Sequence, residues 1–377
     1  MKKLIVGITI PGSVGLLEGQ LAYFKEQGFD TYLMAPKDEK SLSYCERENC
    51  KLLEITIARE ISLVSDLKTL FQIIKILKAV KPDVVNFGTP KISLLGLMAA
   101  KFCGVKNRIF TCRGFRFEHE EGFLQWLLKR MDTITSYCAN TIICISASVK
   151  ELGVKENIFD EKKCVIINKG SSNGFNLTKF NPAFVSEDSK AQLRNTLGIQ
   201  QDNFVYGFLG RIIDRKGINE LYEAFCDLYK SDSNLRLLIV GPFDHGQIKD
   251  KNLFDALSNH PGIVMPGRTD EVPLFLSLMD VFVLPAWWEG FGNVLVQAAA
   301  MGIPVISTFG TGTRDAVSDG YNGILVAVKD ASKLKDAMNE LHVNEFRRST
   351  LGSNGIEWAK NFENEIIWNG MLDLYNA

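Results

Sequence analysis

The chain has 377 residues, of which 46% are apolar and 23% are charged, and its formal net charge is -1. That length makes two domains the default expectation, and the near-neutral charge excludes the cationic surplus of a nucleic-acid-binding protein. The eight cysteines include no Cys-x-x-Cys pair and several lie in apolar runs, which argues against a disulfide framework or a zinc site and favours a reducing cytoplasm.

Short apolar runs alternate with helical patterns along the chain, which is typical of doubly wound parallel sheets. The first run, residues 3–10, is expected to be a buried strand and not a signal peptide, because a Pro-Gly turn and an amphipathic helix follow it. Gly28 is expected to end that helix, and a helix over 66–80 should stop before Pro82. Further strands of this first half are predicted at 30–35, 83–88, 141–146 and 164–168.

The alternation breaks between residues 170 and 198, in a polar segment with Gly, Asn and Pro that we predict to be the domain junction. It then restarts with strands predicted at 203–210, 235–241, 262–267, 281–286, 304–307 and 322–326. We therefore expect an α/β protein made of two Rossmann-like, doubly wound domains that face each other across a cleft. The predicted parts are residues 1–180, residues 181–355, and a C-terminal helix, 356–377, that packs back on the first domain.

Two cations flank the loop that follows the first strand of the second half. Arg211 and Lys216 lie between a strand ending at Leu209 and a helix beginning near Gly217. Backbone amides and the helix dipole would add to these charges, so the loop is a candidate pyrophosphate site. Two solvated loop cations are the alternative interpretation, and the loop alone favours neither.

The stretch AWWEGFGNVLVQAAAMGIPVI, residues 286–306, joins an acidic residue to a helix start. We expect Asn293 to cap that helix, so that the amides of residues 291–294 are free to face an anion. Glu289 has the wrong charge for a phosphate, but it can accept hydrogen bonds from sugar hydroxyls just beyond one. Trp287 and Trp288 are expected to desolvate this carboxylate partly.

This stretch, with GRIIDRKG upstream, resembles the retaining glycosyltransferase family four, which has the GT-B fold and an E-x7-E hallmark. Residues 168–182 look like the family's N-G-V-D…F-x-P segment, and the chain is most similar to bacterial members that build surface glycans. The resemblance implies an N-terminal acceptor-binding domain and a C-terminal nucleotide-sugar-binding domain. It implies retaining transfer from a nucleotide diphosphate sugar, expected to be a UDP-sugar, to a hydroxyl of a glycan linked to a polyprenyl diphosphate.

The resemblance also implies roles for single residues. Arg211 and Lys216 match the pair that binds the diphosphate and offsets charge on the departing nucleotide, and Glu289 matches the first Glu of the motif. Catalysis is thereby assigned to these three residues, with Glu289 on the sugar hydroxyls. The other implied donor contacts are Gly12, Ser13, Arg268, Thr269, Phe291, Gly292, Asn293, Val294 and Gln297.

Two departures from the family pattern are visible. Gln297 replaces the second Glu, which usually binds the ribose, and loss of that charge would weaken donor binding by about 1 kcal/mol. Arg113 stands where many relatives have a His before a Gly. Arg113 and Arg116 are candidates for neutralising an acceptor phosphate, whereas His119 lies either near the reacting centre or in a solvated loop.

No Asp-x-Asp motif follows a strand end, so we expect no obligatory metal and no other cofactor, with cations and helix dipoles stabilising the leaving group. No run approaches the ~18 to 20 apolar residues of a transmembrane helix, so the protein is expected in the cytoplasm, peripheral to the inner face of the membrane. A basic rim would suit anionic headgroups, or is simply a solvated lysine face. It comprises Lys68, Lys75, Lys78, Lys81, Lys101, Lys106, Arg108, Arg113, Arg116, Lys129 and Arg130.

Two functions of other classes remain open at this point. A nucleotide-sugar epimerase of the same fold would need acid and base residues that the four histidines do not favour. A non-catalytic nucleotide-sugar-binding subunit is supported only by Gln297 and the missing His. A Rossmann dehydrogenase would need the G-x-G-x-x-G fingerprint that the sequence lacks.

Overall fold

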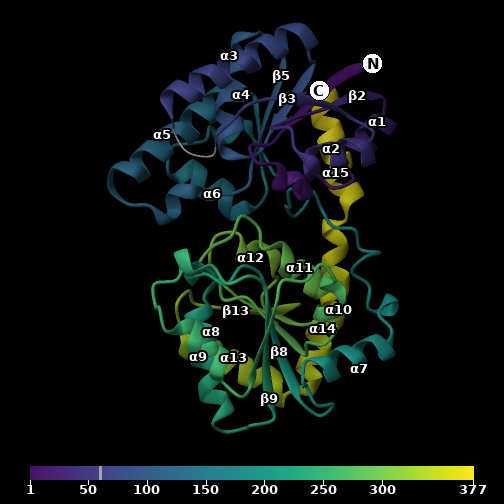
Figure 1. The fold of residues 1–377 in the computed structure, drawn as a ribbon, viewed down its shortest axis with the longest axis vertical. Coiled ribbons are helices and arrows are strands. Elements are labelled where there is room, and N and C mark those ends of the chain that lie inside the picture. Colours follow the sequence, from purple (N-terminus) through teal and green to yellow (C-terminus); the bar gives the residue numbers. More distant parts are fainter. Residues whose placement is uncertain (59–61) are drawn as a thin grey trace. The chain divides into compact units, whose positions relative to one another are not determined.

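The computed structural model describes residues 1–58 and 62–377, and the chain divides into two units (Figure 1). Unit 1 holds residues 1–174 and 364–377, and unit 2 holds residues 175–363. The expected junction at 180/181 lies too late in the chain. Phe175 donates its amide to the Phe362 carbonyl at 2.7 Å, so the chain after Gly174 already pairs with the end of unit 2.

The C-terminal helix expected over 356–377 is two helices, which is a correction. Helix α14 spans Glu345–Ala359 and belongs to unit 2, a 3-10 turn follows at Lys360–Phe362, and α15 spans Asn364–Asn376 in unit 1. Phe362 is buried within unit 2, whereas α15 buries Ile367, Met371 and Tyr375 within unit 1. The break falls where the chain changes the core on which it packs.

Unit 1 is a seven-stranded parallel sheet in the order β3-β2-β1-β4-β5-β6-β7. Its strands are β1 Lys2–Gly7, β2 Phe29–Ala35, β3 Lys51–Glu54, β4 Val84–Phe87, β5 Asn107–Cys112, β6 Thr141–Cys144 and β7 Cys164–Val165. Its other helices are α1 Gln20–Glu26, α2 Glu39–Arg47, α3 Leu63–Val80, α4 Pro90–Phe102, α5 Gly122–Cys138 and α6 Ala147–Lys155. Three 3-10 turns complete the unit: η1 Pro11–Leu17, η2 Arg116–His119 and η3 Glu161–Lys163.

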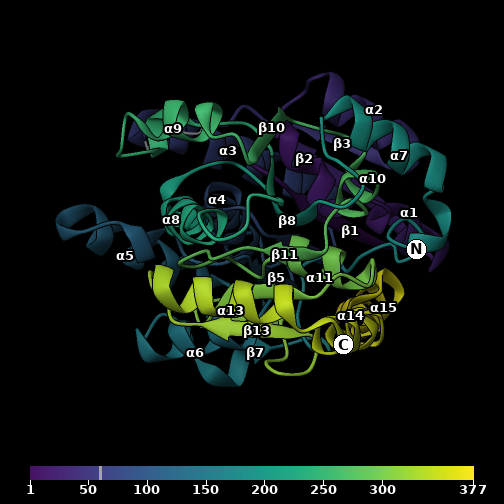
Figure 2. The same cartoon turned by 90° about the horizontal axis from the view of Figure 1, so that it is seen from below.

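The helices of unit 1 cover both faces of its sheet. One apolar core lies beneath α3, α4, α5 and α6, and a second lies beneath α1, α2 and α15. Figures 1 and 2 show α3, α4 and α5 side by side as one layer. Burial on both faces explains why the strands are nearly continuous apolar runs in the sequence.

Unit 2 is a six-stranded parallel sheet in the order β10-β9-β8-β11-β12-β13. Its strands are β8 Phe204–Leu209, β9 Leu235–Val240, β10 Ile263–Gly267, β11 Val281–Val283, β12 Val305–Thr308 and β13 Gly323–Val326. The helices besides α14 are α7 Glu187–Thr196, α8 Ile218–Tyr229, α9 Leu253–Asn259, α10 Val272–Leu276, α11 Asn293–Ala300, α12 Thr313–Ala316 and α13 Ala331–Val343. The 3-10 turns are η4 Pro182–Phe184, η5 Asp214–Lys216 and η6 His245–Gln247.

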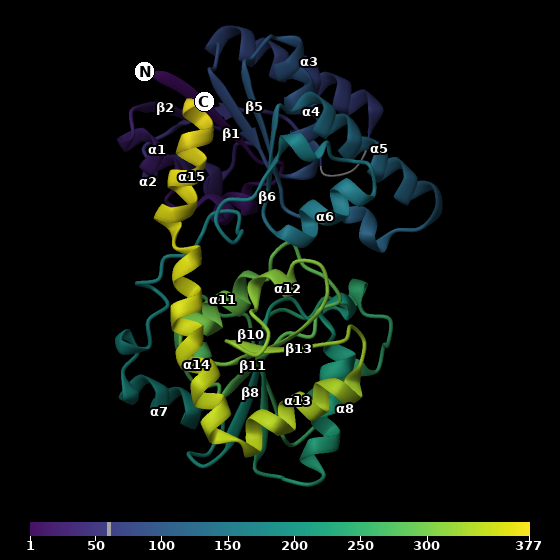
Figure 3. The same cartoon turned by 180° about the vertical axis from the view of Figure 1, so that it is seen from behind.

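Two helix pairs hold the unit 2 sheet between them. Helices α8 and α13 pack together, and so do α11 and α14 (Figure 3). The second pair approaches closely through glycine, since a Cβ on Gly352 would lie 2.3 Å from the Gly302 carbonyl oxygen. The carboxyl-terminal end of α11 and the turn after it are therefore held by direct backbone packing.

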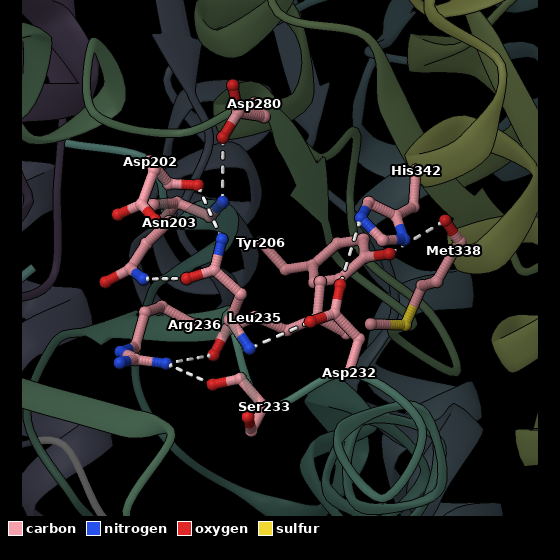
Figure 4. Close-up of polar contacts among 12 residues, drawn as sticks. Asp202, Asn203, Tyr206, Asp232, Ser233, Leu235, Arg236, Asp280, Met338 and His342 are labelled. Atoms are coloured by element: carbon pink, nitrogen blue, oxygen red, sulfur yellow. Dashed lines mark hydrogen bonds and ion pairs between the residues drawn. The ribbon is translucent and has the colours of Figure 1, made fainter. Parts of the chain in front are cut away.

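The amino-terminal edge of this sheet is closed by polar contacts, which Figure 4 shows. The Asp280 carboxylate accepts a hydrogen bond from the Val205 amide at 2.7 Å, and the Tyr206 hydroxyl donates to the Met338 carbonyl at 2.9 Å. The His342 Nε2 lies 3.5 Å from the Asp232 carboxylate. Because side chains satisfy one another here, ligand chemistry is expected at the opposite, carboxyl-terminal edge.

Within the described part of the chain, every helix is too short or too polar to cross a membrane. All eight cysteines are free thiols.

Candidate functional site

Two loops at the carboxyl-terminal edge of the unit 2 sheet meet because glycines allow it. The loop after β8 ends at Gly217, whose φ is +72° and whose Cβ, if present, would lie 2.0 Å from the Pro285 carbonyl oxygen. The Trp287 amide donates to the Arg215 carbonyl at 2.8 Å across the same contact. The cations of the first loop are thereby brought to the carboxylate of the second.

Glu289 lies at the centre of a cluster of opposite charges. Its Oε1 atom is 2.5 Å from the Lys216 Nζ atom and 3.6 Å from the Arg215 Nη1 atom. The Glu289 side chain is 16% exposed and the Lys216 side chain 13% exposed. Water therefore screens these charges less than it would screen a surface pair, and the attraction is correspondingly stronger.

Arg215 is the residue of this cluster that the sequence interpretation missed. Its guanidinium carbon lies 4.0 Å from the centre of the Trp288 ring, and its Nη1 donates to the Trp288 carbonyl at 3.4 Å. Burial lowers the pKa of Arg215, and the Glu289 carboxylate opposes that shift. The signal available in the sequence was the Arg-Lys-Gly run that lies upstream of Trp-Trp-Glu.

The other tryptophan fixes the loop from its second side. Trp287 donates its indole Nε1 proton to Glu220 of α8 at 2.9 Å, and the Lys329 Nζ atom lies 4.0 Å from the Trp287 ring centre. The Glu289 amide donates to the Thr311 carbonyl at 2.8 Å. Helix α8 and the β12–α12 loop thus both hold the segment that carries Glu289.

Arg211 is separate from this ion cluster. Its guanidinium is half-exposed and its Nη1 atom lies 3.8 Å from Asp244 Oδ2. The turn between Arg211 and Lys216 is fixed by buried Asp214, which accepts hydrogen bonds from Asn219 Nδ2 at 3.1 Å and from the Lys249 amide at 2.9 Å. The ion pair of Arg211 is thus longer and more exposed than the pair that Lys216 forms with Glu289.

The start of α11 differs from expectation at Asn293. The helix begins at this residue and Gly292, with φ +83°, is its cap, with no side-chain capping hydrogen bond. Asn293 is exposed, and Phe291 and Val294 are buried, Phe291 against Phe362 at 5.1 Å between ring centres. Side chains 291 and 294 therefore belong to the core, and only the backbone there can face an anion. Gln297 is half-buried one turn further along α11.

The loop after β10 carries the other predicted donor contacts. Arg268 is exposed, with its Nη2 3.4 Å from the Asp270 carboxylate, and the Thr269 hydroxyl accepts from the Glu271 amide at 3.0 Å. Strand β10 is an edge strand, separated from β8 by β9. The structure therefore does not bring Arg268 and Thr269 into the Glu289 cluster.

The predicted residues of unit 1 lie at the carboxyl-terminal edge of its own sheet. Gly12 is exposed and Ser13 half-buried in η1, where the Ser13 amide donates to the Ile10 carbonyl at 2.8 Å. Arg113 follows β5 and lies against Gly88, whose Cβ, if present, would be 1.7 Å from Arg113 Nη1. Burial lowers the pKa of Arg113 to about 10.

The two remaining residues lie in η2. Arg116 is exposed, with its Nε 3.8 Å from the Glu120 carboxylate, whereas its neighbours Phe115 and Phe117 are buried. The backbone of His119 ends η2, but its side chain lies outside what the structure describes. The described residues contain no group of three His, Cys, Asp or Glu side chains that could hold a metal ion.

Comparisons with known proteins identify the class of enzyme. The model of the family "Glycosyl transferases group 1" matches residues 189–358, and that of "Glycosyl transferase 4-like" matches residues 13–146. The capsular polysaccharide biosynthesis glycosyltransferase CapM of Staphylococcus aureus is 34% identical over 100% of this chain and 97% of its own. The UDP-Gal:alpha-D-GlcNAc-diphosphoundecaprenol alpha-1,3-galactosyltransferase of Escherichia coli is 29% identical over 82% of this chain and 79% of its own.

Solved structures support the same fold. HepE of Anabaena, solved in complex with UDP and glucose, superposes with a TM-score of 0.82 at 18% identity, covering 99% of both chains. The two doubly wound units therefore form a GT-B fold, which confirms the predicted fold class. The chain belongs to glycosyltransferase family four, in its branch of bacterial surface-polysaccharide enzymes. These findings do not favour the epimerase or the non-catalytic subunit.

Proposed function

We propose that this glycosyltransferase moves a sugar from a UDP-sugar to a hydroxyl of a glycan linked to a polyprenyl diphosphate, with retention of anomeric configuration, during synthesis of a bacterial surface polysaccharide. The observation that carries the proposal is the ion pair between Glu289 and Lys216. A ligand that is half diphosphate and half sugar has one partner for each of these two side chains. The names of the S. aureus and E. coli relatives support the polysaccharide, the UDP donor and the lipid-linked acceptor.

The donor is proposed to rearrange the ion cluster. Lys216 would turn from Glu289 to a phosphate oxygen, and half-exposed Arg211 would approach the same diphosphate. The oxygen of Glu289 released by Lys216 would accept hydrogen bonds from the sugar hydroxyls. Arg215, held on the Trp288 ring, would stay beside Glu289 as its remaining counter-ion.

The other donor contacts are proposals of the same kind. The backbone of Phe291, Gly292, Asn293 and Val294 would offer amides to the phosphate and sugar, and Gln297 would bind the ribose with one hydrogen bond accepted and one donated. Gly12 and Ser13 are proposed to contact the donor phosphates, and Arg268 and Thr269 the base. Of these, Arg268 and Thr269 receive least support, because they lie apart from the Glu289 cluster.

The transfer step is proposed to occur on one face of the sugar. The bond from the anomeric carbon to the β-phosphate oxygen breaks, and the acceptor oxygen forms its bond on the same face. The acceptor proton passes to the departing phosphate oxygen, whose charge Lys216 and Arg211 offset. On the acceptor side, Arg113 and Arg116 are proposed to neutralise the lipid diphosphate.

A transfer assay tests the proposal directly. The protein is incubated with a UDP-sugar and a short-chain polyprenyl diphosphate sugar, and the product's anomeric configuration is read by proton NMR. The proposal requires a product with the donor's own anomeric configuration. An inverted product would contradict the retaining mechanism, and UDP-sugar isomerised without acceptor would contradict the assignment as a transferase.

A further inference from the structure

Helix α3 presents an unusual face to the solvent. The exposed residues of α3 include Val64, Leu67, Phe71, Lys75 and Lys78, at the spacing of three or four residues that places them on one side of a helix. Lys68 is exposed beside them. A helix that only covers a sheet would be polar on its outer side, so the exposed apolar residues need another explanation.

Helix α5 repeats the same pattern. Its exposed residues Phe123, Trp126, Arg130, Ile134 and Tyr137 follow one another at intervals of three or four. The rings of Phe123 and Trp126 are stacked 5.6 Å apart, and the Arg130 guanidinium lies 5.7 Å from the Trp126 ring centre. Large aromatic side chains and a cation therefore share the outer side of a second helix.

The two stripes belong to one layer, because α3 and α5 both pack against α4. At the ends of the helices, Lys78 of α3 lies 5.7 Å from the ring of exposed Phe102 of α4, and Lys101 of α4 lies 3.3 Å from the ring of Tyr137 of α5. We call the exposed residues of this layer the α3–α5 face: Val64, Leu67, Lys68, Phe71, Lys75, Lys78, Phe102, Phe123, Trp126, Arg130, Ile134 and Tyr137. Half-buried Lys101 lies beside them.

The α3–α5 face carries positive charge with little to balance it. Helices α3, α4 and α5 contain only two acidic residues, Asp66 and Asp132. Asp66 is paired with buried Lys91 at 2.7 Å, and Asp132 is half-buried. The nearest exposed carboxylate along the chain is Glu121, just before α5. Beyond α3, Lys78 lines a cavity together with Lys2, Lys81 and Lys106, and Asp83 and Ala377 line the same cavity.

We propose that the α3–α5 face docks on the surface of an anionic phospholipid membrane. Lysines and arginines of the face would meet headgroup phosphates, while the aromatic and aliphatic side chains would enter the boundary between headgroups and acyl chains. Exposed Trp, Tyr and Phe beside Lys and Arg suit that boundary, which is apolar on one side and negatively charged on the other. The proposal rests on the proposed function in one respect: a lipid-linked acceptor would lie in the same membrane.

Vesicle binding with a charge-matched control tests the role of the cations. Phosphatidylcholine vesicles with and without phosphatidylglycerol are mixed with the protein and separated by sedimentation. The double variant Lys68→Glu, Lys75→Glu changes the face, and Lys37→Glu, Lys40→Glu makes the same charge change at or beside α2, on the other face of the sheet. Since each lysine near an anionic surface contributes about fivefold, the first variant should bind at least about 25-fold more weakly and the second as wild type.

The apolar half of the face has its own matched pair. Phe71→Ser removes a side chain that is 68% exposed in α3, and Phe184→Ser removes one that is 70% exposed in unit 2. Phe71→Ser should weaken vesicle binding by about tenfold, because the inserted ring is lost. Phe184→Ser should bind vesicles as wild type does. Trp126 fluorescence should also shift to shorter wavelength on vesicles, because the indole leaves water.

The outcomes separate membrane docking from sugar transfer, provided UDP-sugar binding is measured on the same variants. Weak vesicle binding by the Lys68→Glu, Lys75→Glu variant with unchanged UDP-sugar binding would support the proposal. No binding of wild type to phosphatidylglycerol vesicles, or equal binding by the two lysine variants, would overturn it. Self-association of wild type without vesicle binding would assign the face to a second copy and overturn it as well. Vesicle binding without any UDP-sugar binding would instead contradict the proposed function.

Discussion

At the scale of single residues, the account depends on where the charge of Glu289 is balanced. Lys216 is its closest partner, but that ammonium is also the group expected to meet the diphosphate. Arg215 lies 3.6 Å from the same carboxylate oxygen and is held against Trp288. The carboxylate thus keeps one cation when the other moves, and its desolvation stays compensated.

Replacing Arg215 should therefore impair catalysis, although Arg215 is not one of the residues to which the family resemblance assigned a role. We expect Arg215→Ala to lower kcat/KM by at least about tenfold, because Glu289 would face the sugar without its remaining counter-ion. Arg215→Lys should recover only part of this loss, since an ammonium keeps the charge but lacks the planar group that stacks on Trp288. Steady-state kinetics of both variants check this, and wild-type values for Arg215→Ala would contradict it.

Gly217 is a second residue whose replacement has a defined effect. A Cβ atom at this position would clash with the Pro285 carbonyl. The residue that carries it would also have to adopt a φ of +72°, which side chains disfavour. We expect Gly217→Ala to lower the free energy of unfolding by more than about 2 kcal/mol. Gly198 is the matched control, because its φ is +68° but a Cβ there would meet nothing within 4 Å. Gly198→Ala should cost only about 1 kcal/mol, and equal urea midpoints for the two variants would contradict the clash.

At the scale of elements, α5 contains the carboxyl of Asp132, whose titration should change the free energy of unfolding with pH. Burial raises the pKa of Asp132 to about 7, above the ~3.9 of an unfolded chain. Between these values the folded state binds more protons at Asp132 than the unfolded state, so the contribution of Asp132 to stability falls as pH rises from about 4 to about 7. Asp132→Asn should remove this loss and stabilise the protein at pH 7, by a few kcal/mol at most since a pKa unit corresponds to about 1.4 kcal/mol.

Urea unfolding of wild type and Asp132→Asn across that pH range is the measurement. The two curves of stability against pH should converge near pH 4 and separate toward pH 7. Curves that stay parallel over the whole range would show that the Asp132 carboxyl titrates as it does in the unfolded chain.

The elements also show how far the sequence alone could be interpreted. The apolar runs predicted the six strands of unit 2 and five of the seven strands of unit 1, because strands buried on both faces appear as apolar runs in the sequence. Strands β3 and β5 were not predicted, since β3 is half-exposed and β5 begins with polar Asn107 and Arg108. Helix α4 was not predicted, since it is buried on nearly all sides beneath α3 and α5 and has no periodic polar face. The helical pattern after residue 344 looks continuous, because periodicity does not reveal that α14 and α15 pack on different cores.

For the site, the motif predicted functional roles for Glu289 and Lys216, and the structure adds their contact. Sequence spacing could not predict that ion pair, because it forms only where Gly217 lets the loop after β8 approach Pro285. The cap of α11 was predicted at Asn293 and lies at Gly292, for a related reason. Asn is a favoured cap on average, but a left-handed Gly can replace a capping side chain.

At the scale of the whole molecule, the proposed chemistry relies on side-chain cations instead of a divalent metal. If Lys216 and Arg211 offset the charge of the departing UDP, transfer should continue in excess EDTA at a rate within about twofold of the untreated enzyme. Loss of turnover in EDTA that Mg²⁺ or Mn²⁺ restores would contradict this. The Lys216→Ala variant is the internal comparison, and it should lose at least about 100-fold in kcat whether or not metal is present.

The central claim is that Glu289 binds the sugar of a nucleotide-sugar donor. Calorimetric titration of wild type and Glu289→Ala with UDP and with UDP-sugars tests it most directly. We predict that one UDP-sugar binds wild type at least about tenfold more tightly than UDP does, because the carboxylate accepts charge-assisted hydrogen bonds from sugar hydroxyls. In Glu289→Ala that advantage should disappear while UDP still binds. A variant that keeps the full preference for the UDP-sugar, or a wild type that binds neither ligand, would contradict the assignment.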